Sequence, residues 1–453
     1  MKKNNCWWDK RLKVVLIVPE NSMASKMNNI VGETENAWEF EARMRLWSCP
    51  SLSLLTVAGM MPEGSDIEYI DLNYTSEPDI SADWVFFSPS TAQANRAYQL
   101  ADMLRKNGIK IAMGGPHVTI LPNEASQHSD VVFIGESEKT FLAFLKDLEK
   151  QKTKRIYKAS NFTDITMSPT PLYHLARQHP YKSIPIQTSR GCPHQCSFCI
   201  SSKIYGNKIR CKTGIQLENE LFTVKEIFGK SYVFFTDDNF FINKQRNDNL
   251  ISIIKNSKVN WYAFSDAKIA EDGKLLSEIA NAGCTQLLIG FESLCSENLQ
   301  GLNKSSWKMK KLQSYKEIIN RIQSLGIGVV GSFIVGMEND TVDVFDNLYA
   351  FIEETSLYAT NITVLTPFPG TKIYEKLKYE RRLISKDWTA YNGFELTFKP
   401  NHMTIEEFEK GYTGLNTQLN STERMYRVIE HFKTVFAAKK RNESNVNVKC
   451  KNV

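Results

Sequence analysis

The sequence contains no long hydrophobic run. Its first apolar stretch, Val14–Val18, is ended by Pro19 and Glu20, whereas a membrane-spanning helix needs about 18 to 20 consecutive apolar residues. No later stretch reaches that length. The first stretch is also too short for the core of a secretory signal peptide. We therefore expect a cytoplasmic protein.

The sequence also lacks the signs of several common classes of protein. Its nine cysteines are an odd number in a chain of 453 residues, and without an export signal they do not indicate a disulfide framework. The GxGxxG fingerprint is absent, which argues against a nicotinamide cofactor. A net charge of +6 is small for this length and predicts no nucleic-acid partner. Clustered cysteines are better explained as metal ligands or reactive thiols.

The first 150 residues contain short strands that alternate with helices. Gln93–Asn107 has apolar residues at helical spacing and is followed by Gly108, a typical helix stop. The alternation predicts an α/β fold in which residues 1–150 form a doubly wound parallel sheet. Five buried strands are expected, at Val14–Val18, Ile67–Ile70, Trp84–Ser88, Ile109–Met113 and Val131–Ile134.

Sheets of this kind bind ligands beyond the carboxyl ends of their strands. Gly114 and Gly115 follow one strand and would let a flat ligand approach the backbone, although they also fit a tight turn from strand to helix. The block resembles the cobalamin-binding domain that precedes many radical S-adenosylmethionine (SAM) cores. The resemblance rests on Leu52–Pro62, Asp71, GGPH at 114–117 and GESE at 135–138.

The resemblance implies that cobalamin binds to this block. Many such domains carry a DxHxxG loop whose His ligates the cobalt from below. None of the seven histidines here has an Asp two positions before it, so we expect no His below the cobalt. A degenerate domain that binds nothing remains open.

The most specific motif of the chain is SRGCPHQCSFCI at 189–200, in which Cys192, Cys196 and Cys199 have CxxxCxxC spacing. An iron–sulfur cubane normally takes four thiolates, so three in one loop leave one iron able to chelate the amino and carboxylate groups of SAM. Zinc is the competing metal, with His194 as candidate fourth ligand of a closed site. The motif resembles that of the radical SAM superfamily. The resemblance implies a 4Fe–4S cluster that cleaves SAM to a 5′-deoxyadenosyl radical.

The residues around this motif fit the partial barrel of that superfamily. Residues 151–181 are polar and contain three prolines, which predicts a linker. Residues 182–397 are then expected to form a partial (β/α)6 barrel, with active-site residues at the carboxyl ends of its strands. The strand candidates are Ile184–Thr188, Tyr232–Thr236, Trp261–Ser265, Gln286–Gly290, Gly328–Ile334 and Asn361–Leu365.

The resemblance also implies cofactor contacts, while no catalytic side chain is singled out. Phe198 would pack near the adenine, or serve as a plain core aromatic. Asp237 and Asp238 would accept hydrogen bonds from the amino group of SAM, although Asp238 also fits a helix cap. Glu292 and Ser293 resemble ribose and methionine contacts, with a turn or capping role as the alternative.

Residues 398–453 are expected to be helical. Thr404 and Glu407 have the spacing of a capping box. The stretch Leu415–Phe436 mixes apolar with basic residues, which indicates packing against the barrel or peripheral contact with a membrane.

These features predict a radical SAM enzyme with a 4Fe–4S cluster, SAM and cobalamin, by resemblance a methyltransferase acting on an unactivated carbon. The alternatives are a radical cyclase or rearrangement enzyme, and a non-catalytic cobalamin- or metal-binding regulatory protein. The TDDNF segment at 236–240 and GFES at 290–293 argue against a regulator, because a sensor needs no site for cofactor cleavage. The expected partners are a small-molecule or lipid substrate and an external electron donor such as flavodoxin or ferredoxin.

Overall fold

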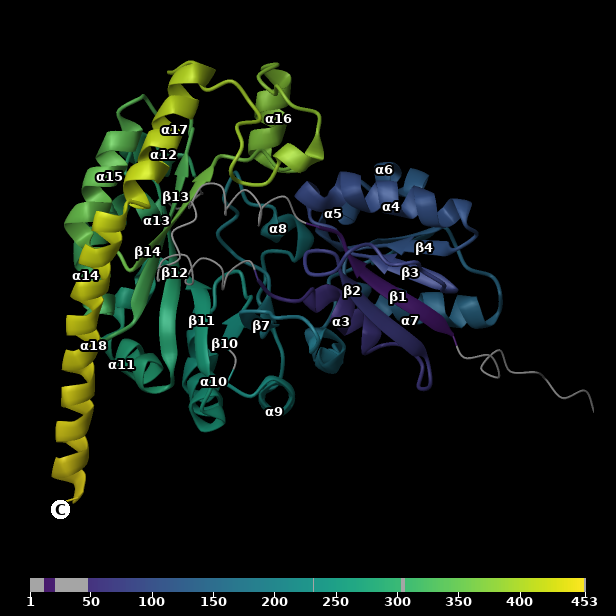
Figure 1. Cartoon of the computed structure of the whole chain (residues 1–453), viewed down its shortest axis with the longest axis horizontal. Helices are drawn as coiled ribbons and strands as arrows, with labels where there is room; N and C mark the ends of the chain where they lie inside the picture. Colours follow the sequence, from purple (N-terminus) through teal and green to yellow (C-terminus); the bar gives the residue numbers. More distant parts are fainter. Residues whose placement is uncertain (1–11, 21–47, 231, 303–305, 452–453) are drawn as a thin grey trace, which may run out of the picture.

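The computed structural model describes residues 12–20, 48–230, 232–302 and 306–451, with side chains as far as residue 437. Two six-stranded parallel sheets lie side by side, the first at the right of Figure 1 and the second at the left. Two further short strands, β8 (Ser189–Arg190) and β9 (Arg210–Cys211), form an antiparallel pair. The predicted fold class is confirmed.

The first sheet has the strand order β2-β1-β3-β4-β5-β6. Its strands are β1 (Lys13–Val18), β2 (Asp66–Asp71), β3 (Trp84–Phe87), β4 (Lys110–Met113), β5 (Val131–Ile134) and β6 (Ile156–Lys158). The chain turns from β2 to β3 on the other side of β1, and a doubly wound sheet binds ligands at such a switch point. The five predicted strands are present, but β6 lies within residues 151–181, where the sequence predicted only an irregular linker.

Alternating side chains of this sheet pack into two separate cores. Val15, Ile17 and Phe87 face one side, which is covered by α4 (Ala94–Lys106), α5 (Gly115–Ile120) and α6 (Pro122–His128). Leu16 and Phe86 face the other side, which is covered by α3 (Leu52–Ala58) and α7 (Ser137–Glu149). Successive strand residues point to opposite faces, so a continuous apolar run such as Val14–Ile17 supplies side chains to both cores.

The second sheet curves into a partial barrel with the order β14-β13-β12-β11-β10-β7. All six predicted strands are present: β7 (Ser183–Ile186), β10 (Tyr232–Phe235), β11 (Asn260–Ser265), β12 (Cys284–Glu292), β13 (Gly328–Val335) and β14 (Ala359–Val364). The helices that follow or separate them are α8 (Ser201–Ile204), α9 (Gly214–Phe228), α10 (Lys244–Ser257), α11 (Gly273–Asn281), α12 (Ser296–Gln300), α13 (Trp307–Lys311), α14 (Tyr315–Gln323), α15 (Val344–Thr355) and α16 (Lys372–Tyr379).

The inner face of this barrel changes character along its strands. On β13, Val330 joins a buried aromatic cluster, whereas Ser332 and Ile334, two and four residues further on, line a cavity. Because side chains alternate along a strand, these three residues share one face. The amino-terminal half of the barrel interior is therefore packed, and the carboxyl-terminal half is hollow.

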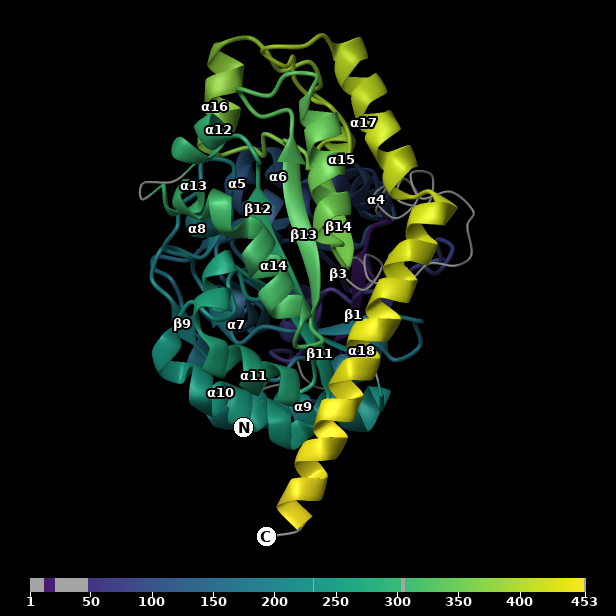
Figure 2. The same ribbon diagram turned by 90° about the vertical axis from the view of Figure 1, so that its left-hand side faces the viewer.

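Two helices complete the chain, α17 (Ile405–Leu419) and α18 (Thr422–Lys451). Thr404 and Glu407 form the predicted capping box at the start of α17. On α18, Val428 and Phe432 pack into the barrel cluster, and the Phe432 ring meets Tyr358 edge to face at 5.1 Å. Helix α18 runs down beside β14 in Figure 2, so the expectation that this region packs against the barrel is confirmed for its described part.

No helix in the described residues is long and apolar enough to cross a bilayer.

Candidate functional site

The three clustered cysteines lie in the loop between β8 and β9, at the carboxyl end of the first barrel strand. Gly191 opens this loop with φ of +102°, and a Cβ on it would lie 2.2 Å from the carbonyl oxygen of Lys208. The Cys192 N–H donates to the carbonyl of Gly206 at 3.1 Å. The loop is thus folded back on itself, and only glycine fits at its narrowest point.

Cys192, Cys196 and Cys199 are free thiols, each partly buried. Burial raises the pKa of Cys192 to about 11 and that of Cys196 to about 12, and it also raises the pKa of Cys199. A metal ligand must be a thiolate, so a bound cationic group has to supply the charge that favours deprotonation. Within the described part of the chain, no three His, Cys, Asp or Glu side chains converge as ligands of a single metal ion. The loop supplies three of the thiolates that an iron–sulfur cluster takes.

The two aspartates after β10 have different surroundings. Asp237 is completely buried and accepts hydrogen bonds from the N–H of Thr188 at 2.9 Å and its hydroxyl at 2.7 Å, and it pairs with Arg246 at 3.2 Å. Its carboxylate therefore joins the ends of β7 and β10. Asp238 lies in the electrostatic surroundings of Cys192 and Cys199, and burial raises its pKa. Of the pair, Asp238 is the residue placed beside the cysteine loop.

A polar cluster next to this loop was missed from the sequence. Asp266, directly after β11, accepts from His194 Nε2 at 3.1 Å and from Asn239 Nδ2 at 2.8 Å. His194 is therefore engaged with a carboxylate. The position of Asp266 directly after a predicted strand was the signal available in the sequence.

Glu292, the last residue of β12, has a strained backbone. Glu292 has φ of +69°, which is uncommon for a residue with a side chain, and the ladder between β12 and β13 shifts register there. Its carboxylate pairs with the buried Lys308, whose Nζ also donates to the carbonyl of Gly290 at 2.7 Å. Glu292 also lies in the electrostatic surroundings of Cys196 and Cys199. Ser293 accepts from the Cys295 N–H at 3.0 Å, as a turn residue does.

A cavity of about 420 Å³ lies at the carboxyl end of the first sheet, between that sheet and the barrel. Gly114 and Gly115 line it, and a Cβ on Gly115, where φ is +91°, would lie 2.4 Å from the hydroxyl of Ser88. Gly115 is thus required where the turn after β4 packs against Ser88, as in a tight turn from strand to helix, and it leaves backbone rather than a side chain facing the cavity. His117 is buried away from this cavity, with Nδ1 3.3 Å from Thr91 and its ring 5.4 Å from that of Trp388.

A second cavity, of about 400 Å³, occupies the carboxyl-terminal half of the barrel. Phe198 of the cysteine loop and Glu292 of β12 line it, as does Ser332 of β13. Ser90, which follows β3 of the first sheet, lines both this cavity and the first one. The two cavities therefore meet at one residue, and the cysteine loop borders the second.

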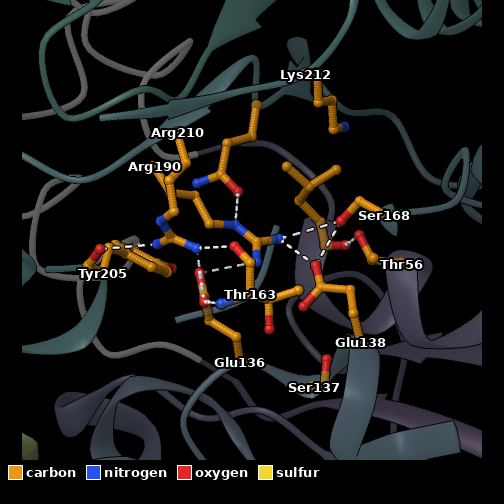
Figure 3. A network of polar contacts seen from close by, with 12 residues as sticks. Thr56, Glu136, Ser137, Glu138, Thr163, Ser168, Arg190, Tyr205, Arg210 and Lys212 are labelled. Carbon is orange, nitrogen blue, oxygen red and sulfur yellow. Dashed lines mark hydrogen bonds and ion pairs between the residues drawn. The ribbon is translucent and has the colours of Figure 1, made fainter. Parts of the chain in front are cut away.

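A buried network of charges ties the first sheet to the cysteine loop (Figure 3). Arg190, directly before Gly191, pairs with Glu138 at 2.7 Å and Glu136 at 3.2 Å. Arg210 of β9 pairs with Glu136 at 2.8 Å. The two glutamates belong to the GESE turn, and Glu136 and Arg190 also line the first cavity. The same four side chains therefore connect the wall of the first cavity to the cysteine loop.

Comparison with known proteins agrees with this geometry. Residues 186–352 match the radical SAM superfamily, and residues 47–145 match the B12 binding domain. The first match contains the cysteine loop and most of the barrel. The second contains both glycines and the GESE turn.

Related proteins share most of the chain. A bacteriochlorophyllide d C-8(2)-methyltransferase of Chlorobaculum tepidum is 26% identical over 364 residues, covering 77% of this chain and 80% of that protein. A hopanoid C-2 methylase of Rhodopseudomonas palustris is 27% identical over 351 residues, covering 75% and 66%. The fold is similar to that of TsrM of Kitasatospora setae, a radical SAM methyltransferase solved with cobalamin and a 4Fe–4S cluster, with a TM-score of 0.64 and 13% identity over 89% of this chain and 91% of that one. The chain is therefore a radical SAM enzyme that carries an N-terminal B12 binding domain.

Proposed function

We propose that the protein is a cobalamin-dependent methyltransferase that methylates an unactivated carbon of a hydrophobic small molecule or lipid. The observation that carries this proposal is the meeting of the two cavities at Ser90. A methyl group passes from one cofactor to a substrate only if both reach the same space in a close, oriented arrangement. The methyltransferases among the relatives support the same reaction type.

The cofactor sites follow from the placement of the side chains. Cys192, Cys196 and Cys199 would hold the 4Fe–4S cluster, and Gly114 and Gly115 would admit cobalamin to the first cavity. When bound, the cluster with SAM supplies a 5′-deoxyadenosyl radical, and methylcobalamin supplies the methyl group.

We propose that SAM lies where the cysteine loop meets the second cavity. Phe198 offers an apolar face there, and Asp238 offers a carboxylate to an ammonium group. Glu292 and Ser293 stand at the next strand end. Asp237 would act indirectly, by fixing the loop from which Asp238 projects.

The lining of the second cavity indicates the class of substrate. Between Phe198 and the barrel strands it is formed mainly by apolar side chains, among them Ile334, Val364, Leu365 and Phe368. An apolar lining also helps to keep water away from radical chemistry. A lipid substrate would bring the protein to a membrane surface, where the basic residues near the C-terminus, such as Lys433, would favour anionic headgroups.

The reaction type can be tested by counting products. With a chemical reductant and a substrate of this class, methylated product, 5′-deoxyadenosine and S-adenosylhomocysteine should form in roughly equal amounts, because each SAM molecule has one fate. Product and 5′-deoxyadenosine without S-adenosylhomocysteine would reject methyl transfer and favour a cyclase or rearrangement enzyme. Neither product nor 5′-deoxyadenosine would favour a regulator.

The cofactor sites can be tested without a substrate. The variant with all three cysteines of the loop changed to Ala should lose bound iron and visible absorption. His117→Ala should leave the resonance spectrum of bound cob(II)alamin unchanged, because the ring is buried away from the cavity. Nitrogen hyperfine splitting that disappears in His117→Ala would contradict this placement.

Reduction of the cluster requires an electron source, and we propose an external one-electron carrier protein such as flavodoxin or ferredoxin.

A further inference from the structure

A third cavity, of about 260 Å³, lies on the other side of the cysteine loop. Cys196 and Cys199 line it, whereas neither lines the cavity at the carboxyl end of the first sheet or the cavity inside the barrel. None of its lining residues is shared with those two cavities. We call this cavity the outer groove. Two of the three residues of the cysteine loop that would hold the cluster thus border a cavity separate from the two already described.

The outer groove is positively charged. Lys203 of α8 and Lys372 of α16 line it and are exposed, and no Asp or Glu belongs to its lining. Among the described residues, neither lysine forms an ion pair. Their charges are therefore directed to solvent beside the cysteine loop.

The walls of the outer groove combine this charge with an apolar edge and a fixed backbone. Phe162 lines the groove with 51% of its surface exposed, and the guanidinium of Arg210 lies 5.2 Å from its ring. The Ile373 N–H donates to the carbonyl of Ser197 at 3.3 Å, which joins the start of α16 to the cysteine loop. Aromatic and Arg side chains of this kind are enriched in protein contact surfaces.

We propose that the outer groove is the docking surface for an acidic one-electron carrier protein. The inference deepens the proposed function, because it assumes that the three cysteines hold a reducible cluster. One electron leaves the carrier, which is oxidised by one electron, and the cluster held by the loop is reduced by one. No proton or bond change is needed in this step.

The chemistry of the groove matches such a partner. Positive charge steers an acidic protein and raises the rate of encounter, and the effect falls as salt increases. Electron-transfer encounters are weak and bury little area, so a small groove with a few exposed side chains suffices. The entry of electrons is thereby separated from the apolar space in which the radical is used.

The test compares a protein reductant with a small one. The anaerobic, cluster-loaded Lys203→Glu/Lys372→Glu variant would be reduced by flavodoxin hydroquinone and, separately, by dithionite, with the visible absorption followed by stopped flow. At low ionic strength we expect the rate with flavodoxin to fall by ~10-fold or more, and the rate with dithionite to stay unchanged. Binding of oxidised flavodoxin, measured by calorimetry, should weaken in parallel. Lys106→Glu/Lys152→Glu makes the same charge change on exposed lysines of the N-terminal domain and should have neither effect.

If flavodoxin reduced the Lys203→Glu/Lys372→Glu variant as fast as the unchanged protein, the proposal would be overturned. An equal loss with both reductants would also overturn it, because the substitutions would then act on the cluster itself. Lys203→Gln/Lys372→Gln should give an intermediate rate if charge is the cause. Neither substrate nor cobalamin is present in this test, so its failure would not argue against methyl transfer. Likewise, a failure to detect methyl transfer with a chemical reductant would not argue against docking.

Discussion

Replacing Arg190 by methionine would remove one charge from the network that joins the two domains. In the intact protein two arginines, Arg190 and Arg210, face two glutamates, Glu136 and Glu138, and all four are largely buried. Arg190→Met keeps much of the side-chain volume but leaves two carboxylates opposite one cation. The penalty then arises from an uncompensated buried charge rather than from lost packing.

The size of the effect follows from the geometry. A pair 2.7 Å apart attracts by about 6 kcal/mol at an effective dielectric constant of about 20, and the desolvation of both groups offsets part of that. Removal of one partner of a buried pair costs about 3–5 kcal/mol. We expect Arg190→Met to lower the free energy of unfolding by that amount. As a control, Arg105→Met removes a partly exposed pair with Asp130, at 3.5 Å, and should cost less than about 1 kcal/mol.

The assay is urea unfolding followed by circular dichroism at neutral pH, with a double-mutant cycle. Adding Glu138→Gln to Arg190→Met makes the network neutral again, so the double variant should be more stable than Arg190→Met alone. The coupling between the two positions should lie within about 0.5–3 kcal/mol. Additive losses, or a double variant less stable than both single ones, would refute the argument that unpaired charge causes the loss.

Three further predictions concern the cavity, the barrel and pH. Gly115→Ala should weaken cobalamin binding in a spectroscopic titration, because its Cβ would meet Ser88 at 2.4 Å with φ at +91°; unchanged affinity would place the turn away from the ligand. Phe432→Ala should lower the free energy of unfolding by about 3–5 kcal/mol, because it empties a buried site against Tyr358; a loss under about 1 kcal/mol would show that α18 is not needed to fill the barrel. Burial raises the pKa of Asp340 to about 6, so the folded state binds the extra proton between about pH 4 and pH 6, and its contribution to stability, up to about 3 kcal/mol, is lost as the pH rises through that range. Unfolding curves from about pH 4 to pH 7 should be flatter for Asp340→Asn, and equal slopes would contradict this.

Local patterns were sufficient to predict most of the fold. All six barrel strands were found because each is a short apolar run that ends in polar residues, and the capping box at Thr404 follows from a spacing of three residues. β6 was missed because its three residues, Ile156–Lys158, are flanked by charge and pair only with the sheet edge. A strand of that length is defined by its partner rather than by its own composition.

The site was predictable only where its residues are adjacent in sequence. The cysteine spacing identifies the loop, but the roles of Asp237 and Asp238 diverge because Thr188 and Arg246 approach only one of them. The pairing of Arg190 with Glu138 joins residues that are 52 positions apart, and no periodicity indicates it.

The position of α18 has a consequence for how the chain is made. The helix follows the whole barrel in sequence, yet Val428 and Phe432 complete the packing around Phe234 and Tyr262. During synthesis these aromatic side chains therefore leave the ribosome well before α18, which packs against them. Until α18 follows they are exposed, and exposed apolar surface of this kind favours aggregation. A chain cut before α18 would keep all its cofactor residues and still present an open barrel floor, so attempts to shorten the protein should retain residues through Phe432.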